Sequence, residues 1–294
     1  MGFEEAYEEF KIYASKRHKK QGFVTIDQDF SKHVLPYFKE KKINELTKLD
    51  VINWQNEILS NNYSNSFNAK LYYVFNSFVK YCVCCSYLNE NVVSIVGSFN
   101  KKIEIKSHTT YTIRQFRKFR RYISNFVIKQ FFNFMYFYGT RPSEAMALRF
   151  VDLKFRYVFV RHSIERKGKR TLDTPKNQSS IRVIKINFLM LFRIWLLKKY
   201  YVKKFGLFSN DYFIFGGLKP LAPTTIDRYK KEAYTKAKLP SITQHEFRHS
   251  YATRRIHKNV PIDVVSRSMG HSKVSTTLDI YLHQEKNTIN VFSL

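Results

Sequence analysis

Glycine and proline are scarce in this chain, and their scarcity limits the folds open to it more than any other feature of the sequence. There are 9 Gly and 7 Pro among 294 residues, about half the share of these residues in an average globular protein. Turn-dense sandwiches, low-complexity chains and collagen-like chains are therefore disfavoured. Apolar residues make up 44% of the sequence, enough for a core, so we expect a folded, helix-rich protein of about two domains.

The first hundred residues have the pattern of a small helical domain. Their apolar residues recur at helical spacing in three stretches: Phe3, Tyr7, Phe10 and Ala14; Val51, Trp54 and Ile58; and Phe67, Leu71, Phe75 and Phe78. Thr47 and Asp50 are placed to form the capping box of the second helix. We predict an all-α domain over residues 1–100, a polar linker over residues 101–109 and a second domain over residues 110–294.

The second domain is predicted to be α+β and mostly helical. Helical patterns cover residues 113–138 and 142–148, and they return from Phe188 onward. Between them lie three β-like runs, namely Tyr157–Val160, Arg170–Thr174 and Ile181–Ile186. A Lys-Gly turn at residues 167–168 and a polar loop separate these runs. We therefore expect a three-stranded antiparallel sheet within a helical domain.

The three cysteines, Cys82, Cys84 and Cys85, are crowded together and odd in number. They build no disulfide framework, which indicates a reducing compartment. Cys82 continues an apolar helical stripe, so we expect it in the core. The N-terminus lacks the pattern of a secretory signal, and the most apolar window, Ile186–Leu197, is too short for a membrane span. We expect a soluble, cytoplasmic protein with no membrane partner.

The distribution of charge points to nucleic acid as the partner. The formal net charge is +28; residues 1–100 hold 12 Lys+Arg and 11 Asp+Glu, whereas residues 101–294 hold 39 and 12. A positive field of this size attracts phosphate backbones through counterion release. The basic cluster of the first domain consists of Lys16, Arg17, Lys19 and Lys20. This cluster either contacts a DNA backbone or is only a solvated face.

Arg141 stands at the start of a predicted helix, between Gly139 and Pro142, because proline is favoured at the first helical position. An anion docked there would receive backbone N–H groups, the positive end of the helix dipole and a guanidinium fork. The alternative is a solvent-facing arginine in an N-terminal turn.

The stretch HEFRH at residues 245–249 has two interpretations. It matches the H-E-x-x-H signature, in which two histidines bind zinc and the glutamate activates water. It also places His245 and Arg248 on one helix face, from which both side chains could reach a phosphate oxygen. An arginine beside a divalent metal is unfavourable, and a zinc protease makes no use of the positive charge of this domain. The zinc protease is therefore the remote alternative.

Four separated motifs agree in order and spacing with one known family. They are GTRPSE around Arg141, the His245-x-x-Arg248 pair, Met269-Gly270-His271 at a helix end, and Tyr281 ten residues after His271. Together they resemble the tyrosine recombinase (phage integrase) family, and the chain is similar to integrases of bacteriophages and conjugative transposons. The resemblance runs from about Ser107 to the end, and more loosely over the first domain, which is similar to the family's core-binding domain.

The resemblance implies a role for each matching residue. Tyr281 is the nucleophile, Arg141 and Arg248 clamp the scissile phosphate, and His245 and His271 assist by hydrogen bonding and proton handling. Glu144 matches a supporting acidic residue.

The family also uses a lysine as the general acid for the leaving 5′ oxygen, in the loop between the second and third strands. Lys176 matches that lysine. Lys167 and Lys169 lie in the earlier turn of the same sheet; they are the alternatives for this role and candidate DNA contacts.

The function that the resemblance implies is that of a site-specific DNA recombinase or integrase. Such an enzyme cleaves and rejoins strands through a covalent 3′-phosphotyrosine intermediate and a Holliday junction. Guanidinium groups can stabilise the charge of the transition state without a metal, so we expect no cofactor. The implied partners are a double-stranded DNA recombination site, a homo-oligomer that is a tetramer on DNA, and an accessory DNA-bending protein. The expected location is a bacterial nucleoid or a phage-infected cell.

Two other functions stay open at this stage, and the match has three departures. A type IB topoisomerase uses similar catalytic residues as a monomer, and a DNA-binding protein without catalysis would have no need of Tyr281. Phe150 replaces the usual Trp, and Asn91-Val92 replaces the Asn-Pro often found at the domain boundary. No arm-binding domain precedes the first domain, so we expect either a simple two-domain recombinase or a truncated one. The apolar residues of segment 282–294 dock either on a neighbouring subunit or on their own domain.

Overall fold

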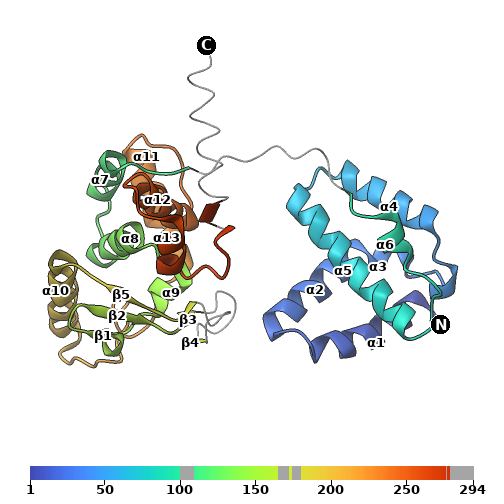
Figure 1. The fold of residues 1–294 in the computed structure, drawn as a ribbon. Coiled ribbons are helices and arrows are strands. Elements are labelled where there is room, and N and C mark those ends of the chain that lie inside the picture. Colours follow the sequence, from blue (N-terminus) through green and yellow to red (C-terminus); the bar gives the residue numbers. More distant parts are fainter. Residues whose placement is uncertain (100–108, 165–171, 174–179, 276, 279–294) are drawn as a thin grey trace, which may run out of the picture. The chain divides into compact units, whose positions relative to one another are not determined.

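The computed structural model describes residues 1–99, 109–164, 172–173, 180–275 and 277–278. The chain divides into two compact units, Met1–Glu104 and Ile105–Leu294, which we call unit 1 and unit 2 (Figure 1). Of the predicted linker, residues 101–109, only Thr109 is among the described residues. None of the described helices is both long and apolar enough to cross a membrane.

Unit 1 is built from helices over its described residues. They are α1 (Phe3–Ser15), α2 (Lys20–His33), α3 (Leu35–Phe38), a 3₁₀ turn (Ile43–Glu45), α4 (Lys48–Ser60), α5 (Asn65–Cys84) and α6 (Val92–Val96). The three apolar stretches noted in the sequence lie on α1, α4 and α5. As predicted, Thr47 and Asp50 form a capping box, in which the Asp50 amide donates to Oγ1 of Thr47 at 3.2 Å.

Aromatic rings fill the core of unit 1. Phe3 and Tyr7 of α1 pack against Phe30 of α2 and Phe78 of α5, and the rings of Tyr7 and Phe30 stack with their centroids 3.9 Å apart. Cys82 is fully buried in the same core, as the apolar stripe predicts. Large buried rings contribute most of the hydrophobic stabilisation of a domain of this size.

Unit 2 is mostly helical and contains a small sheet. Its helices are α7 (Ile113–Arg121), α8 (Phe126–Tyr138), α9 (Pro142–Ala147), α10 (Phe188–Phe205), α11 (Pro223–Lys236), α12 (Gln244–Ile256) and α13 (Ile262–Met269), and a 3₁₀ turn covers Phe150–Asp152. Its strands are β1 (Leu153–Lys154), β2 (Tyr157–Val160), β3 (Ser163–Ile164), β4 (Leu172–Asp173) and β5 (Arg182–Lys185). The helical pattern over residues 113–138 is two helices, because Asn125 caps a new helix.

The predicted three-stranded antiparallel sheet is present, but one of its strands differs from the prediction. Its order is β1-β2-β5, with Val158 opposite Ile184 between β2 and β5. The predicted run Arg170–Thr174 contributes only β4, which pairs with β3 in a separate two-stranded ribbon. Both edges of β2 are already paired, by β1 and β5, so β2 offers no edge to β4.

The core of unit 2 is arranged around α8, which is buried on nearly all sides. Helix α12 packs against α8, and Phe247 of α12 lies against Phe132 with their ring centroids 4.9 Å apart. The residue after Phe247 is Arg248, which is 3% exposed. Packing of α12 on α8 therefore carries a guanidinium group into the interior, toward the end of α8.

Candidate active site

Arg141 lies at the junction of α8 and α9, at the helix start that the sequence predicts. It is the N-cap of α9, Pro142 is the first helical residue, and Gly139 ends α8 in the left-handed conformation. The side chain of Arg141 is fixed by three bonds. Nη1 donates to Oε1 of Glu144 at 2.7 Å and to Oγ of Ser180 at 3.0 Å, and Nη2 donates to the carbonyl of Gly270 at 2.9 Å.

Glu144 is buried and stays ionised among arginines. Burial alone would raise its pKa, but the charges of Arg182, Arg248 and Arg141 outweigh burial and hold the pKa of the carboxyl below its usual value. Its carboxylate accepts from the backbone N–H of Arg141 at 2.9 Å as well as from that side chain. Glu144 therefore fixes both the backbone and the guanidinium group of Arg141.

Arg182 belongs to this cluster, although no motif in the sequence pointed to it. Its side chain is 8% exposed and donates to Oε2 of Glu144 and to the carbonyls of Ser180 and Ser268. A signal for it was present, because the alternation of β5 places Arg182 on the same face as the buried Ile184. A charged residue on the core face of a strand requires buried partners.

Arg248 is the most deeply buried cation of the site. Nη1 donates to the carbonyl of Gly139 at 2.7 Å, and Nη2 donates to no group among the described residues. Burial first, and then the positive charge of Arg141, lowers the pKa of Arg248 to about 9, which leaves it cationic at neutral pH. A buried donor of this kind is costly without an acceptor, so the site is suited to an anion.

His271 follows α13, which ends at Gly270 in the left-handed conformation as predicted. Nδ1 of His271 is 2.8 Å from Oγ1 of the buried Thr277. Burial, followed by the charges of Arg248 and Arg141, lowers the pKa of His271 to about 3. The ring is therefore neutral near pH 7, with one nitrogen that donates a hydrogen bond and one that accepts a hydrogen bond.

His245 lies exposed in the first turn of α12, on the helix that also carries Arg248. The glutamate of the H-E-x-x-H match is engaged elsewhere. Oε2 of Glu246 accepts from the backbone N–H of Thr243 at 2.6 Å, as part of the helix cap, and Oε1 accepts from that of Thr109 at 2.9 Å. A carboxylate that holds two backbone amides is poorly placed to activate a metal-bound water, so the zinc protease interpretation loses its general base.

Four of the predicted residues lie outside the part of the chain that the structure describes. They are Tyr281, Lys176, Lys167 and Lys169, and the apolar segment 282–294 lies outside it as well. The structure brings together Arg141, Glu144, Arg248 and His271.

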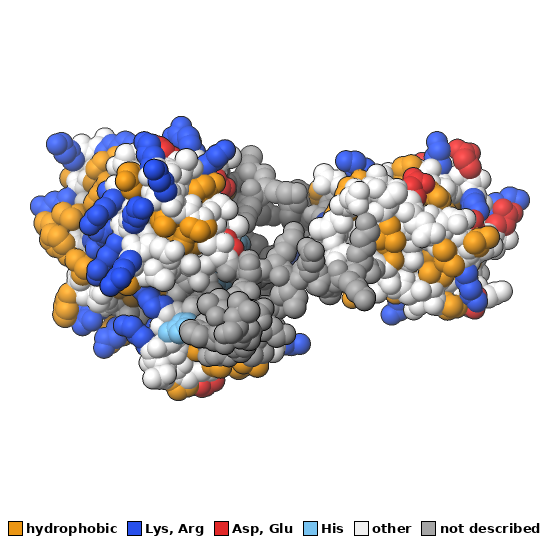
Figure 2. Space-filling model, turned by 90° about the horizontal axis from the view of Figure 1, so that it is seen from above, with side chains coloured by type: hydrophobic (Ala, Val, Ile, Leu, Met, Phe, Trp, Pro, Cys, Tyr) orange, Lys and Arg blue, Asp and Glu red, His pale blue; other side chains and the backbone are white. Residues whose placement is uncertain are grey.

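The cluster Lys16, Arg17, Lys19 and Lys20 spans the end of α1 and the start of α2 in unit 1. Lys16, Arg17 and Lys19 are exposed, and the guanidinium carbon of Arg17 lies 3.8 Å from the centre of the Tyr13 ring. Lys and Arg also spread over the visible face of unit 2 with few acidic side chains, whereas unit 1 shows both signs (Figure 2). This contrast agrees with the uneven distribution of charge along the sequence.

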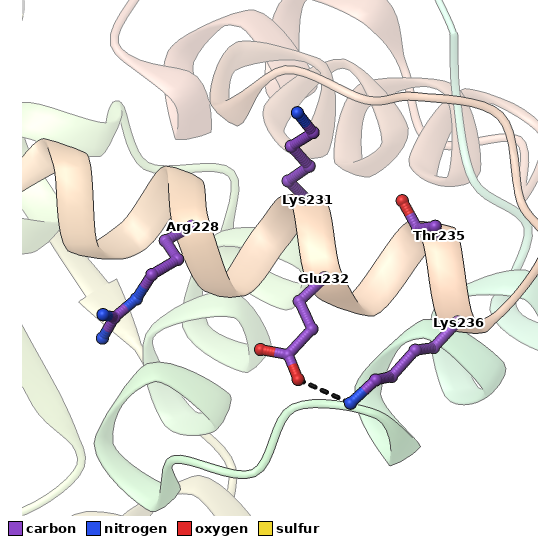
Figure 3. A pocket seen from close by; sticks show the side chains of 5 residues that line it. All are labelled: Arg228, Lys231, Glu232, Thr235 and Lys236. Atoms are coloured by element: carbon purple, nitrogen blue, oxygen red, sulfur yellow. Dashed lines mark hydrogen bonds and ion pairs between the residues drawn. The ribbon is translucent and has the colours of Figure 1, made fainter.

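A shallow hollow on α11 contains none of the predicted site residues. It is lined by Arg228, Lys231, Glu232, Thr235 and Lys236, all from the one helix, and Glu232 pairs with Lys236 at 2.6 Å (Figure 3). An open face with a satisfied surface ion pair has the character of a solvated helix side rather than of a reaction centre.

Comparisons with known proteins agree on one family. The profile described as "Phage integrase family" matches residues 109–288, and the profile "Phage integrase, N-terminal SAM-like domain" matches residues 2–59. A tyrosine recombinase of Thermosipho africanus is 31% identical over 202 residues, which are 67% of this chain and 57% of that protein. The chain thus spans a little over half the length of this relative.

Two solved structures share the fold over nearly the whole chain. The Tn1549 transposon integrase in complex with transposon right end DNA has a TM-score of 0.77 at 20% identity, over 96% of this chain and 95% of that one. A lambda integrase tetramer bound to a Holliday junction has a TM-score of 0.73 at 12% identity, over 93% of this chain and 78% of that one.

Proposed function

The chain belongs to the phage integrase family, and on that basis we propose that it is a site-specific tyrosine recombinase that cleaves and rejoins DNA strands. The observation that carries the proposal is the buried Nη2 of Arg248, which has no acceptor among the described residues and lies close enough to Arg141 to be repelled by it. A phosphodiester would supply both the acceptor and the compensating negative charge.

The proposed reaction assigns one step to each group. Tyr281 first loses its phenolic proton to solvent, which the positive charge of Arg141 and Arg248 favours. The phenolate oxygen then attacks the scissile phosphorus, a 3′-phosphotyrosine bond forms, and the bond to the 5′ oxygen breaks. Lys176 gives the leaving oxygen its proton, so a 5′-hydroxyl is released. Arg141 and Arg248 stabilise the charge that develops on the non-bridging oxygens, and His245 and His271 donate hydrogen bonds. Attack by a 5′-hydroxyl of another strand reverses the step, so strand exchange needs no ATP.

The relatives support strand exchange over simple DNA relaxation. The similar proteins are a tyrosine recombinase and a transposon integrase, and one structural neighbour is a tetramer on a Holliday junction. We therefore assign double-stranded DNA as the substrate, a mobile element as the context and a homotetramer on DNA as the working assembly. A type IB topoisomerase would instead act as a monomer.

Trapping on a nicked suicide DNA that carries the recombination site tests the proposal. The nick lets the short 5′ fragment diffuse away, so a covalent protein–DNA adduct accumulates. We expect the unaltered protein to form adduct in the presence of a metal chelator, and Tyr281→Phe to form none. Native mass measurement of the protein–DNA complexes should show assemblies of four protomers on a synapsed pair of sites.

A Tyr157→Phe variant is the control, since Tyr157 is an exposed tyrosine on β2 that the proposal leaves out of the chemistry. It should form adduct at the normal rate. Adduct that persists in Tyr281→Phe would remove this tyrosine from the mechanism, and complexes of one protomer per duplex under all conditions would count for the topoisomerase.

A further inference from the structure

Arg182 and Arg141 hold the same three parts of unit 2. Each donates to the carboxylate of Glu144, each donates to Ser180, and each donates to a carbonyl at the end of α13, that of Ser268 for Arg182 and that of Gly270 for Arg141. These contacts join α9, Ser180 two residues before β5, and the turn that leads to His271, which lie close together in unit 2 (Figure 1).

The two arginines differ in how much of each is left for a ligand. The side chain of Arg141 is 30% exposed, whereas that of Arg182 is 8% exposed. Arg182 uses Nε, Nη1 and Nη2 for its three bonds, at 2.9, 3.0 and 2.9 Å. Arg182 therefore lies behind the site with every nitrogen engaged, and Arg141 is the member of the pair that can meet a phosphate.

We propose that Arg182 is a positioning residue of the recombination site, which holds the carboxylate of Glu144 in place and thereby fixes Arg141 and the His271 turn in the geometry that cleavage needs. This inference rests on the proposed function.

The charge of Arg182 matters because it lies beside the buried carboxylate of Glu144. The carboxylate is buried, and Arg182 is its strongest attractive partner, ahead of Arg248 and Arg141. A neutral Glu144 would lose much of its attraction for Arg141 and would leave the cations to repel one another.

The shape of the Arg182 guanidinium group matters as well as its charge. Its planar fork spreads three donors toward Glu144, Ser180 and Ser268 at once. A lysine keeps the charge but gathers its donors on one nitrogen, so it can hold Glu144 but not all three acceptors. Arg182→Lys therefore removes the geometry, and Arg182→Gln removes the charge as well.

Single-turnover cleavage of the nicked suicide DNA at saturating protein separates the effect of charge from the effect of hydrogen-bond geometry. The rate is measured from pH 5 to pH 8. We expect both variants to bind DNA within about twofold of the unaltered protein, because Arg182 does not reach the ligand, and to cleave about 10- to 100-fold more slowly. The unaltered protein and Arg182→Lys should lose no cleavage rate toward pH 5 through Glu144, because its pKa lies below the usual value. Arg182→Gln should lose rate toward pH 5, because the pKa of Glu144 rises when its strongest cationic partner is lost.

Arg161→Lys is the matched control, since Nη2 of Arg161 donates to the equally buried Asp152 at 2.9 Å in the same unit. It should leave the cleavage rate and the pH profile unchanged. Normal cleavage by both Arg182 variants overturns the inference, as do equal losses of cleavage, DNA affinity and melting temperature with no pH shift, which mark a role in folding alone. If the unaltered protein forms no adduct, the proposed function fails instead, and the inference falls with it.

Discussion

Arg248 is a buried guanidinium group with too few acceptors among the described residues, and this favours the binding of an anion. Burying a guanidinium group is expensive unless charged or polar partners replace its water. Arg248 receives one carbonyl, that of Gly139, and shares one carboxylate, Glu144, with Arg141 and Arg182. Three cations around one buried acid leave an excess of positive charge, which an incoming phosphate can neutralise.

Lys176 is the proposed general acid of the reaction. We expect Lys176→Ala to slow cleavage of ordinary DNA about 10²- to 10⁴-fold, because the 5′ oxygen must then leave without a proton donor. A substrate with sulfur at the 5′ bridging position should restore the rate, since a thiolate leaves without protonation. Single-turnover adduct formation on the two substrates gives the comparison.

Lys167→Ala and Lys169→Ala serve as controls for this prediction. Both lysines are candidate DNA contacts, so cleavage is compared at saturating protein, where both variants should cleave both substrates at the normal rate. Failure of the sulfur substrate to rescue Lys176→Ala, together with rescue of one of these two variants, would transfer the role to the earlier turn.

The site residues that stand in short local motifs could be predicted from the sequence. Arg141 and Glu144 are i, i+3 across a helix start, and the His245–Arg248 pair has the same spacing, so local periodicity places each pair on one side of a helix. Arg182 escaped because its partners Glu144 and Ser268 are remote in sequence. Only the folded arrangement of β5, α9 and α13 gives it a role.

At the level of elements, the helices were more predictable than the sheet. Caps such as Thr47 and glycine ends such as Gly270 are decided by neighbouring residues, so sequence spacing was enough to place them. Strand pairing is not local. β1 is only Leu153–Lys154, too short for an alternating pattern, yet it is the third strand of the sheet in place of the predicted run at residues 170–174.

The turn between α8 and α9 depends on Gly139, which leaves no room for a side chain. Gly139 has φ +64°, and a Cβ added there would lie 2.4 Å from Cδ1 of Tyr251. Gly139→Ala should lower the free energy of unfolding by about 2–4 kcal/mol, the sum of left-handed strain and a steric clash. Cleavage should fall as well, because the carbonyl of Gly139 accepts from Nη1 of Arg248 at 2.7 Å. Urea unfolding and the adduct assay measure the two effects.

Gly206→Ala is the matched control. Gly206 also ends a helix with positive φ, +74°, but a Cβ there meets nothing within 4 Å. This variant should lose only about 1–2 kcal/mol, the strain alone, and keep full cleavage. Equal destabilisation by the two variants would show that the contact with Tyr251 adds nothing.

At the scale of the whole molecule, the two units differ in net charge, and we expect them to differ in how they bind DNA. Unit 2 carries nearly all of the net charge, so most of the salt-sensitive affinity for DNA should come from it. Unit 1 is close to neutral, so we expect any DNA contact of unit 1 to come from a local patch such as the exposed cluster Lys16, Arg17 and Lys19. A cluster that binds a DNA backbone releases counterions from the DNA, whereas a cluster that only faces water releases none. The salt dependence of DNA affinity therefore distinguishes the two cases.

Replacing Lys16, Arg17 and Lys19 together by Gln in the full chain should therefore reduce the slope of log affinity against log salt by about 2 to 3, because each phosphate contact accounts for about 0.9. Filter binding or fluorescence anisotropy between 50 and 300 mM salt measures the slope.

A second triple variant tests whether the effect depends on position rather than on total charge. Lys41, Lys48 and Lys70 of unit 1 are already paired with Asp50, Glu90 and Asp29. Replacing these three by Gln removes the same formal charge but releases few DNA counterions, so the slope should change by less than about 1. Equal slopes in the two triple variants would mean that unit 1 contributes only bulk charge. The cluster at the end of α1 would then be a solvated face rather than a DNA contact.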